Sequence, residues 1–259
     1  MADNSALIQD IEKFWNDRAE LGPEAGTADL IAKQLEMEAI ASYVKDGLRV
    51  LEVGCGNGQT AFELARRYDI NILGIDVASK MIEAANALLA DQKLKGSIKF
   101  QVGNAPSLEN ITGKFDLIFS ERVLINLPDW PAQKLAISNI INLLADNGLY
   151  VMCENSQDGL DEINSLRERL GLPAIKVPWH NRYFRDDEIS QTQFPGAALE
   201  GVRYYSSTYY FLSRVVNAWL AAQEGKEPAY DAPINQLALR LPPLGNLGQG
   251  RIWLWRKIR

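Results

Sequence analysis

The sequence has few of the residues that build metal centres and disulfide frameworks. It contains two cysteines and one histidine in 259 residues, and no C-x-x-C pair is present. This scarcity argues against a zinc site and against a disulfide-stabilised fold. It favours a protein of a reducing compartment, and we expect a cytoplasmic location.

Long apolar runs and an excess of positive charge are also missing. No run approaches the roughly 20 residues that span a bilayer, so we expect no integral membrane segment. Residues Met1 to Ser5 lack the basic-then-apolar order of a signal peptide. The net charge of −6 argues against a nucleic-acid partner, which usually requires a basic surface. A globular chain fits these absences.

What the chain does have is a glycine-rich stretch at Arg49 to Thr60, between a short apolar run and a predicted helix. Its alternate glycines, Gly54, Gly56 and Gly58, permit positive φ and let the backbone approach a ligand closely. Such a strand-to-helix turn at the carboxyl edge of a parallel sheet is where nucleotide-like cofactors bind. The G-x-G-x-G spacing, with Glu52 two residues ahead, differs from the dinucleotide fingerprint G-x-G-x-x-G.

Strands and helices alternate on both sides of this turn. We expect helices over 5–17, 29–43 (with Thr27 as N-cap), 61–67, 79–92, 130–145 (ended by Asp146-Asn147-Gly148), 158–171, 208–223 and 233–241. Strands are predicted at 50–53, 70–76, 98–102, 115–120, 149–153, 201–206 and 251–256. The alternation is typical of an α/β fold with a doubly wound, mostly parallel sheet of seven strands.

Two segments beside the turn are candidates for cofactor contact. Asp76 ends the second strand about 20 residues beyond the glycines, where a carboxylate reads a ribose diol. A helix N-cap is the alternative, and Asp76 or Ser79 could provide it. In the first helix, apolar residues that include Phe14 and Trp15 share one face. That face either packs on the core or forms a lid over the cofactor.

Four motifs in order resemble those of class I S-adenosylmethionine (SAM) methyltransferases: Glu52 to Gly58, Asp76, Gly103-Asn104-Ala105, and Ser120 to Leu127. The resemblance covers residues 49–153. It implies SAM as the cofactor and a Rossmann-like methyltransferase fold whose last strand runs antiparallel beside the fifth. The family often has an acid at the position of Asn104, whose amide can still accept a hydrogen bond but carries no charge.

The resemblance also implies that three regions of the chain have different functions. Residues 1–46 would be an N-terminal helical lid, 47–155 the SAM-binding core, and 156–259 the part that completes the sheet and forms the acceptor pocket. Arg18 would hold the carboxylate of the cofactor through its guanidinium. The implied cofactor-binding residues are Trp15, Arg18, Glu52, Gly54, Cys55, Gly56, Gly58, Asp76, Val77, Met81, Asn104, Ala105, Ser120 and Glu121.

The part after Glu154 is similar to bacterial methyltransferases of surface-polysaccharide assembly. The similarity lies in Asn164-Ser165-Leu166-Arg167, Trp179-His180-Asn181, Ser206-Ser207-Thr208-Tyr209-Tyr210 and Asn235-Gln236-Leu237-Ala238. It implies a sugar or another small or glycan-linked hydroxyl acceptor. Whether the chain forms a homodimer is left open.

A hydroxyl acceptor needs a general base, because its oxygen is a poor nucleophile until the proton is removed. His180 has a suitable unperturbed pKa, although a histidine bonded to a loop carbonyl is the alternative. Glu121 and Glu154, at the ends of central strands, are further candidates. The run Asp186-Asp187-Glu188 suggests either a metal or the capped start of a helix, and we expect no metal.

Other activities stay open at this point. Amine or phosphate methylation needs the same cofactor, and a non-catalytic SAM-binding partner protein would keep the same glycine turn. A nicotinamide-dependent enzyme fits less well, because the glycine spacing differs from the dinucleotide pattern.

Overall fold

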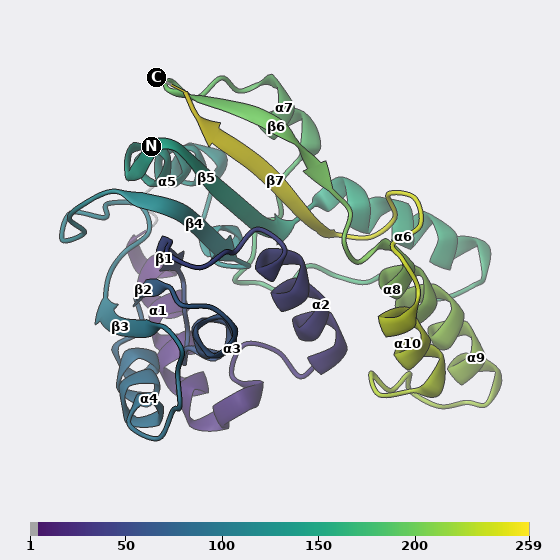
Figure 1. Cartoon of the computed structure of the whole chain (residues 1–259). Helices are drawn as coiled ribbons and strands as arrows, with labels where there is room; N and C mark the ends of the chain where they lie inside the picture. The colour runs from purple at the N-terminus through teal and green to yellow at the C-terminus, as the bar shows by residue number, and fades with distance from the viewer. Residues whose placement is uncertain (1–4, 259) are drawn as a thin grey trace.

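The computed structural model describes residues 5–258, apart from the side chains of residues 5 and 23, and centres on a seven-stranded sheet (Figure 1). Met1 to Asn4, on which the signal-peptide expectation largely rests, lie outside the described residues. The strand order is β3-β2-β1-β4-β5-β7-β6. The strands are β1 (Arg49–Val53), β2 (Asn71–Asp76), β3 (Ser97–Val102), β4 (Phe115–Glu121), β5 (Leu144–Asn155), β6 (Ala197–Arg203) and β7 (Gly250–Lys257).

Pairing within the sheet confirms the predicted doubly wound fold. Strands β1 to β5 are parallel, with β1 between β2 and β4. The chain order therefore reverses at β1, and such a reversal opens a crevice at the carboxyl ends of the strands. Strand β7 runs antiparallel between β5 and β6, so the last strand lies beside the fifth as the resemblance implied.

The helices and short helical turns flank this sheet. They are α1 (Ser5–Arg18), η1 (Ala19–Glu24), α2 (Leu30–Ala41), α3 (Gln59–Arg67), α4 (Ser79–Leu89), η2 (Leu124–Asn126), α5 (Trp130–Asn142), α6 (Gln157–Arg169), α7 (Asp186–Gln191), α8 (Ser207–Phe211), η3 (Leu212–Asn217), α9 (Ala218–Gln223), α10 (Pro233–Leu237) and η4 (Ala238–Arg240). None of the helices between residues 5 and 258 has the length and apolar character needed to cross a membrane.

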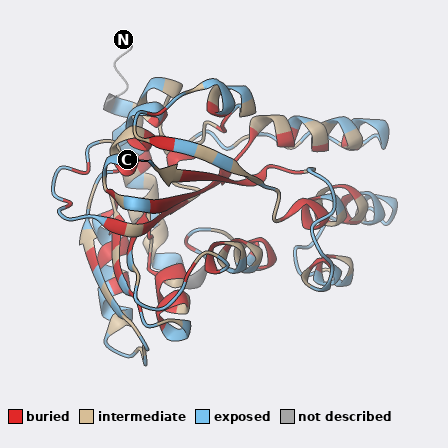
Figure 2. Cartoon of the chain, turned by 45° about the horizontal axis from the view of Figure 1, so that its top comes forward, coloured by how far each residue is buried: buried red, intermediate tan, exposed pale blue. Residues whose placement is uncertain are grey.

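Alternating side chains of the strands build a core on each face of the sheet. Val50 and Phe119 pack with residues of α2, α3 and α4, whereas Leu51 and Ile118 pack with residues of α5, α6 and α7. Successive strand residues point to opposite faces, so central strands must be apolar throughout. Buried residues accordingly concentrate along the strands, and the outer surfaces of the helices are exposed (Figure 2).

Two additions extend this core near its carboxyl edge. Helix α1 packs against α4 and η1. Helices α8, α9 and α10 form a separate group to one side of α2 (Figure 1). Tyr209 of α8 and Ala238 of η4 pack with Ile31 and Ala32, so this group is anchored on α2.

Some predicted boundaries were wrong. Asp29, not Thr27, caps α2, because its carboxylate accepts the N–H of Ala32 at 3.0 Å. The residues predicted to end the helix before β5 belong to β5 itself. Strand β6 covers 197–203 instead of 201–206. The helix predicted over 208–223 is interrupted by a π-helical segment, Leu212–Asn217.

Candidate functional site

The glycine turn leaves β1 in a conformation that few other residues could adopt. Gly54, Gly56 and Gly58 have φ values of 78°, 51° and 85°. A Cβ on Gly54 would lie 2.4 Å from Val123, and one on Gly58 would lie 2.6 Å from the ring of Phe100. At Gly56 the same atom would meet nothing within 4 Å. The outer glycines therefore fit the turn into the core, while Gly56 leaves free space in front of it.

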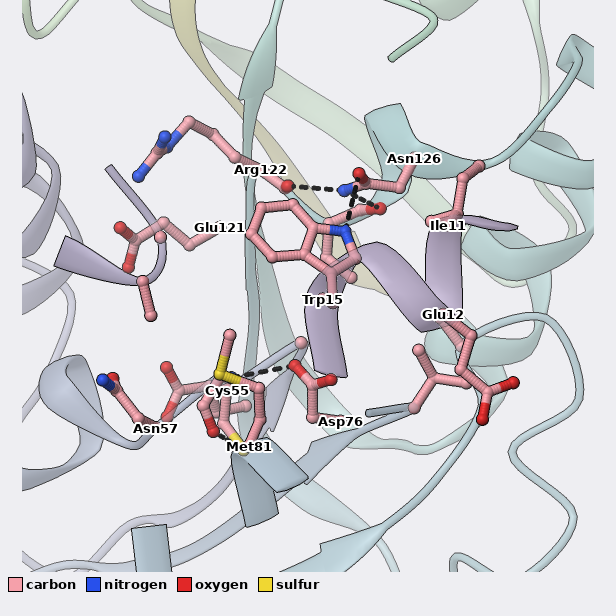
Figure 3. A pocket seen from close by; sticks show the side chains of 18 of the residues that line it. Ile11, Glu12, Trp15, Cys55, Asn57, Asp76, Met81, Glu121, Arg122 and Asn126 are labelled. Carbon is pink, nitrogen blue, oxygen red and sulfur yellow. Dashed lines mark hydrogen bonds between the residues drawn. The ribbon is translucent and has the colours of Figure 1, made fainter. Parts of the chain in front are cut away.

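That free space is part of a cavity of about 190 Å³ at the carboxyl edge of the sheet. In Figure 3, the indole of Trp15 lies across it, with Asp76 and Cys55 on one side and Asn126 on the other. The Trp15 Nε1–H donates to Asn126 Oδ1 at 3.1 Å, which fixes α1 over the opening. Predicted cofactor residues that line this first cavity are Trp15, Glu52, Gly54, Cys55, Gly56, Asp76, Val77, Met81, Asn104, Ala105 and Glu121.

Asp76 stabilises the glycine turn and also lines the first cavity. Its Oδ2 accepts the N–H of Gly56 at 2.9 Å, and its Oδ1 accepts the N–H of Ala78 at 2.9 Å. Burial raises the pKa of Asp76, against the effect of these backbone N–H groups. Neither Asp76 nor Ser79 caps α4, whose N-cap residue is Ala78 without a side-chain bond.

Four of the predicted site residues lie elsewhere. Arg18 donates to the carbonyl oxygens of Ala25 at 2.6 Å and Glu24 at 2.9 Å, so its guanidinium is engaged with its own loop. Gly58 and Ser120 do not line the first cavity. The buried Ser120 hydroxyl lies 2.8 Å from the hydroxyl of Tyr150.

Glu154 is the fourth. It lies near the end of β5, and its carboxyl group is buried against the start of the η2 turn. Its carboxylate accepts the N–H groups of Val123, Leu124 and Ile125 at 3.1–3.4 Å. Burial raises the pKa of Glu154 to about 7, despite these bonds. The residue lines neither of the two cavities found at this edge, so its position favours a structural role.

A second cavity, of about 250 Å³, adjoins the first. Trp15, Gly26, Thr27 and Arg122 line both. Polar and aromatic side chains dominate the second cavity, including Asp29, Glu36, Asn155, His180, Asn181, Tyr183, Tyr210, Arg214, Tyr230 and Gln249. Asn181 Oδ1, Gln249 Oε1 and His180 Nδ1 are buried and find no hydrogen-bond partner within the described part of the chain. Buried polar groups rarely stay unpaired, so this cavity suits a polar ligand.

His180, one of the candidate bases, is surrounded by aromatic rings. Its ring stacks on Phe14, with centroids 4.4 Å apart, and meets Trp15 and Trp179 edge-on at 5.6 Å and 5.4 Å. Burial, with a smaller effect of Arg18, lowers the pKa of His180. The ring thus links α1 to the 173–183 segment while it lines the second cavity.

An ionic cluster that the sequence analysis missed lies where the cavities meet. Lys33 Nζ is 2.5 Å from Glu121 Oε1, and the Thr60 hydroxyl donates to Glu121 Oε2 at 2.7 Å. Arg122 Nε lies 3.0 Å from Glu36 Oε1. One signal was available: Glu36 occupies the buried stripe of α2, four residues from both Ala32 and Ile40. A charged residue in such a stripe requires a partner.

Burial and the neighbouring charges shift the pKa values of the two carboxyl groups of this cluster in opposite directions. Burial opposes ionisation of Glu121, but the positive charges of Lys33 and Arg122 outweigh it and lower its pKa. Burial raises the pKa of Glu36 to about 8, against the attraction of Arg122 and with the repulsion of Glu121. Glu121 therefore stays ionised at neutral pH, and Glu36 holds a proton that it can exchange.

The acidic run at 186–188 opens α7. Asp186 accepts the Ser156 hydroxyl at 2.8 Å and pairs with Arg251, while Glu188 pairs with Arg182 and completes a capping box. These partners match the helix-start interpretation. Across residues 5–258, no group of three or more His, Cys, Asp or Glu side chains is placed to hold a metal ion.

Comparisons with known proteins identify the class of the chain. Residues 44–186, more than half of its length, match a family model described as a methyltransferase domain. The chain therefore belongs to this methyltransferase family. The match and its named relatives show a SAM-dependent methyltransferase domain with SAM as its cofactor.

Individual relatives differ in the atom that they methylate. The chain is 26% identical over 195 residues to 27-O-demethylrifamycin SV methyltransferase of Amycolatopsis mediterranei, covering 66% of this chain and 69% of that one. It is 36% identical over 80 residues to ajmaline N-methyltransferase of Rauvolfia serpentina, covering 31% of this chain and only 28% of the relative.

Among solved structures, the mycolic acid cyclopropane synthase CmaA1, complexed with SAH and CTAB, matches with a TM-score of 0.56 at 16% identity. The match covers 87% of this chain and 84% of that one, and at this identity it shows the fold alone.

Proposed function

We propose that this protein methylates a hydroxyl group of a small acceptor, with a sugar or sugar-linked molecule as the expected class. The observation that carries the proposal is the pair of adjoining cavities. One is formed by the glycine turn and Asp76, and the other presents unpaired polar groups beside the ionic cluster of Lys33, Glu36, Glu121 and Arg122. An acceptor in the second cavity would therefore lie next to a cofactor in the first.

The first cavity fits SAM in its polar chemistry. Glu52 Oε2 is buried, lines this cavity and has no hydrogen-bond partner in the described chain, so it can receive an ammonium group. Asp76 can receive hydroxyl groups, and the space in front of Gly56 allows close contact with the backbone. When bound there, SAM supplies a methyl group made electrophilic by the sulfonium.

The residues around the cavities then contribute mainly alignment. Trp15 covers the first cavity and borders the second, so α1 can exclude water from the contact between them. Holding two reactants in line supplies a large part of the barrier reduction in displacement reactions. A hydroxyl acceptor needs proton removal in addition, and carboxyl groups at the junction are placed for it.

Unpaired polar groups support a polyhydroxylated acceptor over an apolar one. Asn181 and Gln249 can exchange hydrogen bonds with hydroxyls through either end of their amides. Tyr183, Tyr210 and Tyr230 add aromatic faces to the same cavity. This combination agrees with the sugar acceptor implied by the resemblance of the C-terminal part.

An amine acceptor is the second candidate. The similarity to ajmaline N-methyltransferase favours this chemistry. We also propose a reducing, cytoplasmic setting, because Cys55 and Cys153 are both free and buried.

Calorimetric titration with SAM and with S-adenosylhomocysteine tests the cofactor, and mass spectrometry of an acceptor panel tests the reaction. The panel would contain monosaccharides, nucleotide sugars, phenols, primary amines and phosphate esters. We expect micromolar binding of both cofactor forms and methyl transfer to a hydroxylated member. Transfer to amines alone would replace the hydroxyl assignment, and cofactor binding without any transfer would favour a non-catalytic partner protein.

A further inference from the structure

We propose that Glu36 is the general base that accepts the proton of the acceptor hydroxyl, held in position by Arg122 and the hydroxyl group of Tyr205. The inference rests on the proposed function, since it requires a hydroxyl acceptor in the second cavity. It adds a catalytic residue that the glycine turn and its neighbouring motifs do not include.

The position of Glu36 is the first argument. Glu36 lines the second cavity, Glu121 lines the first, and Arg122 lines both. The side chains of Glu36 and Glu121 are only 1% and 4% exposed. A carboxyl group in this place lies at the junction through which acceptor oxygen and methyl donor must meet.

The backbone of Arg122 is the second argument. Its φ is +52°, a left-handed conformation that is strained for a non-glycine residue and that concentrates at active sites. The N–H of Arg122 donates to the Cys153 carbonyl at 2.9 Å, and its own carbonyl accepts from Asn126 at 3.0 Å. This fixed conformation directs the guanidinium toward Glu36, where Nε lies 3.0 Å from Oε1.

The charges around Glu36 suit a base that works near neutral pH. Three charged groups act on Glu36: Lys33 of α2, Glu121 of β4 and Arg122, which follows β4. Four titratable groups respond to the charge of Glu36: Cys153 of β5, Tyr210 of α8, and Tyr183 and Tyr205 in the connecting segments. Burial, opposed by Arg122, brings the pKa of Glu36 to about 8. A general base is most effective when its pKa lies near the working pH.

The chemical step balances with this assignment. The acceptor O–H bond breaks and its proton moves to the Glu36 carboxylate, while an oxygen electron pair forms the new bond to the methyl carbon. The carbon–sulfur pair returns to sulfur, which loses its positive charge. The protonated Glu36 is reset when it releases the proton to solvent.

His180 also lines the second cavity, but it is a weaker candidate for the general base than Glu36. Catalytic histidines are usually oriented by a hydrogen bond at the second ring nitrogen. Within residues 5–258, the buried His180 Nδ1 has no such partner, and aromatic rings surround the imidazole. The pH profile separates the two, because the pKa of His180 is lowered from its usual value near 6.5 and that of Glu36 is raised.

Glu36→Gln is the central variant, with Glu36→Asp as the conservative one. Glu38→Gln is the matched control, since Glu38 is on the same helix but exposed and paired with Arg67. With the best hydroxylated acceptor of the panel, we expect wild-type kcat/KM to rise with pH and level off above about pH 8. Glu36→Gln should lose this rise and about 100-fold or more of kcat. Glu36→Asp should recover part of the rate, and Glu38→Gln should match wild type.

Two readouts do not depend on turnover. Calorimetry should give unchanged SAM affinity in all variants, which shows that the fold and the first cavity are intact. Infrared titration of the free protein should show a protonated carboxyl C=O band that disappears near pH 8 in wild type and is missing in Glu36→Gln.

Three results would overturn the assignment. They are a Glu36→Gln turnover within tenfold of wild type, a wild-type rate that already levels off below pH 6.5, and the absence of the infrared band. Failure of the proposed function looks different. In that case wild type binds SAM and methylates no hydroxyl, and the base assignment falls with it.

Discussion

The two adjoining cavities are assembled from the chain in different ways. The first is built largely from short segments that follow β1, β2, β3 and β4, together with α1. The second draws Glu36 from α2, Arg122 from the end of β4, His180 from the 173–183 segment and Gln249 from the start of β7. Segments far apart in sequence thus meet only in the folded protein.

The family match covers the two cavities to different extents. It spans residues 44–186, which include most of the lining of the first cavity, whereas Glu36, Arg214 and Gln249 of the second cavity lie outside it. Under the proposed function, the chemistry shared with the family belongs to the first cavity, which would hold the methyl donor. Acceptor choice would then belong to the second cavity, because function resides in the site and not in the fold.

The largest effect is expected for a substitution in the glycine turn that forms the backbone of the first cavity. Gly54→Ala places a methyl group 2.4 Å from Val123 at a φ of 78°, so we expect a loss of about 2–5 kcal/mol in the free energy of unfolding. Gly56→Ala is the matched control, because it has a similar φ of 51° but open space. It should cost only about 1–2 kcal/mol.

Urea denaturation measures both losses, and calorimetry with SAM completes the comparison. Gly56→Ala should still weaken SAM binding, since its methyl group occupies the first cavity. Equal unfolding free energies for the two variants would contradict the packing argument, and normal SAM binding by Gly56→Ala would contradict the cavity assignment.

The second prediction concerns Asp76. Asp76→Ala removes a carboxylate that faces the first cavity and holds the Gly56 N–H at 2.9 Å. We expect SAM affinity to fall about 10- to 100-fold, the usual loss for a hydrogen bond with a charged partner. The exposed Asp91→Ala serves as control. Affinity equal to wild type in calorimetry would remove Asp76 from the cofactor site.

The same difference between local and distant segments explains which parts of the site could be predicted from the sequence. Gly54 and Asp76 were predictable because a strand, a turn and the next strand end at one sheet edge whatever the rest of the chain does. The overall fold was predictable for the same reason, since the alternation of strands and helices prescribes a doubly wound sheet. Both conclusions depend on local pattern alone.

Residues whose position depends on distant partners could not be predicted in this way. The spacing of α2 shows Glu36 only as a charge in an apolar stripe, and its partner Arg122, 3.0 Å away, comes from a distant part of the chain. Arg18 reads as a free cation, but its loop folds back and two carbonyl groups bind it. Glu154 ends a central strand as predicted, yet the N–H groups of η2 close over its carboxylate.

A third prediction sharpens the role of the second cavity. Gln249 is buried, and its Oε1 has no partner among the described residues. Gln249→Leu should therefore leave the unfolding free energy unchanged or higher, because an unpaired buried amide is costly. The KM for a hydroxylated acceptor should rise about tenfold, with SAM affinity unchanged. Steady-state kinetics against the exposed control Gln191→Leu checks this, and an unchanged KM would place the acceptor elsewhere.

The smallest effect is expected at His180, one of the three candidate bases that the sequence indicated. If the ring only joins α1 to the 173–183 segment, His180→Ala should lower kcat less than tenfold and keep the rise of kcat/KM with pH. His180→Phe, which keeps an aromatic ring beside Phe14 and Trp15 but cannot titrate, should restore most of the loss. A true base predicts the opposite: both variants would lose about 100-fold or more. The pair of variants therefore decides whether the second cavity uses its histidine for chemistry or for holding α1 in place.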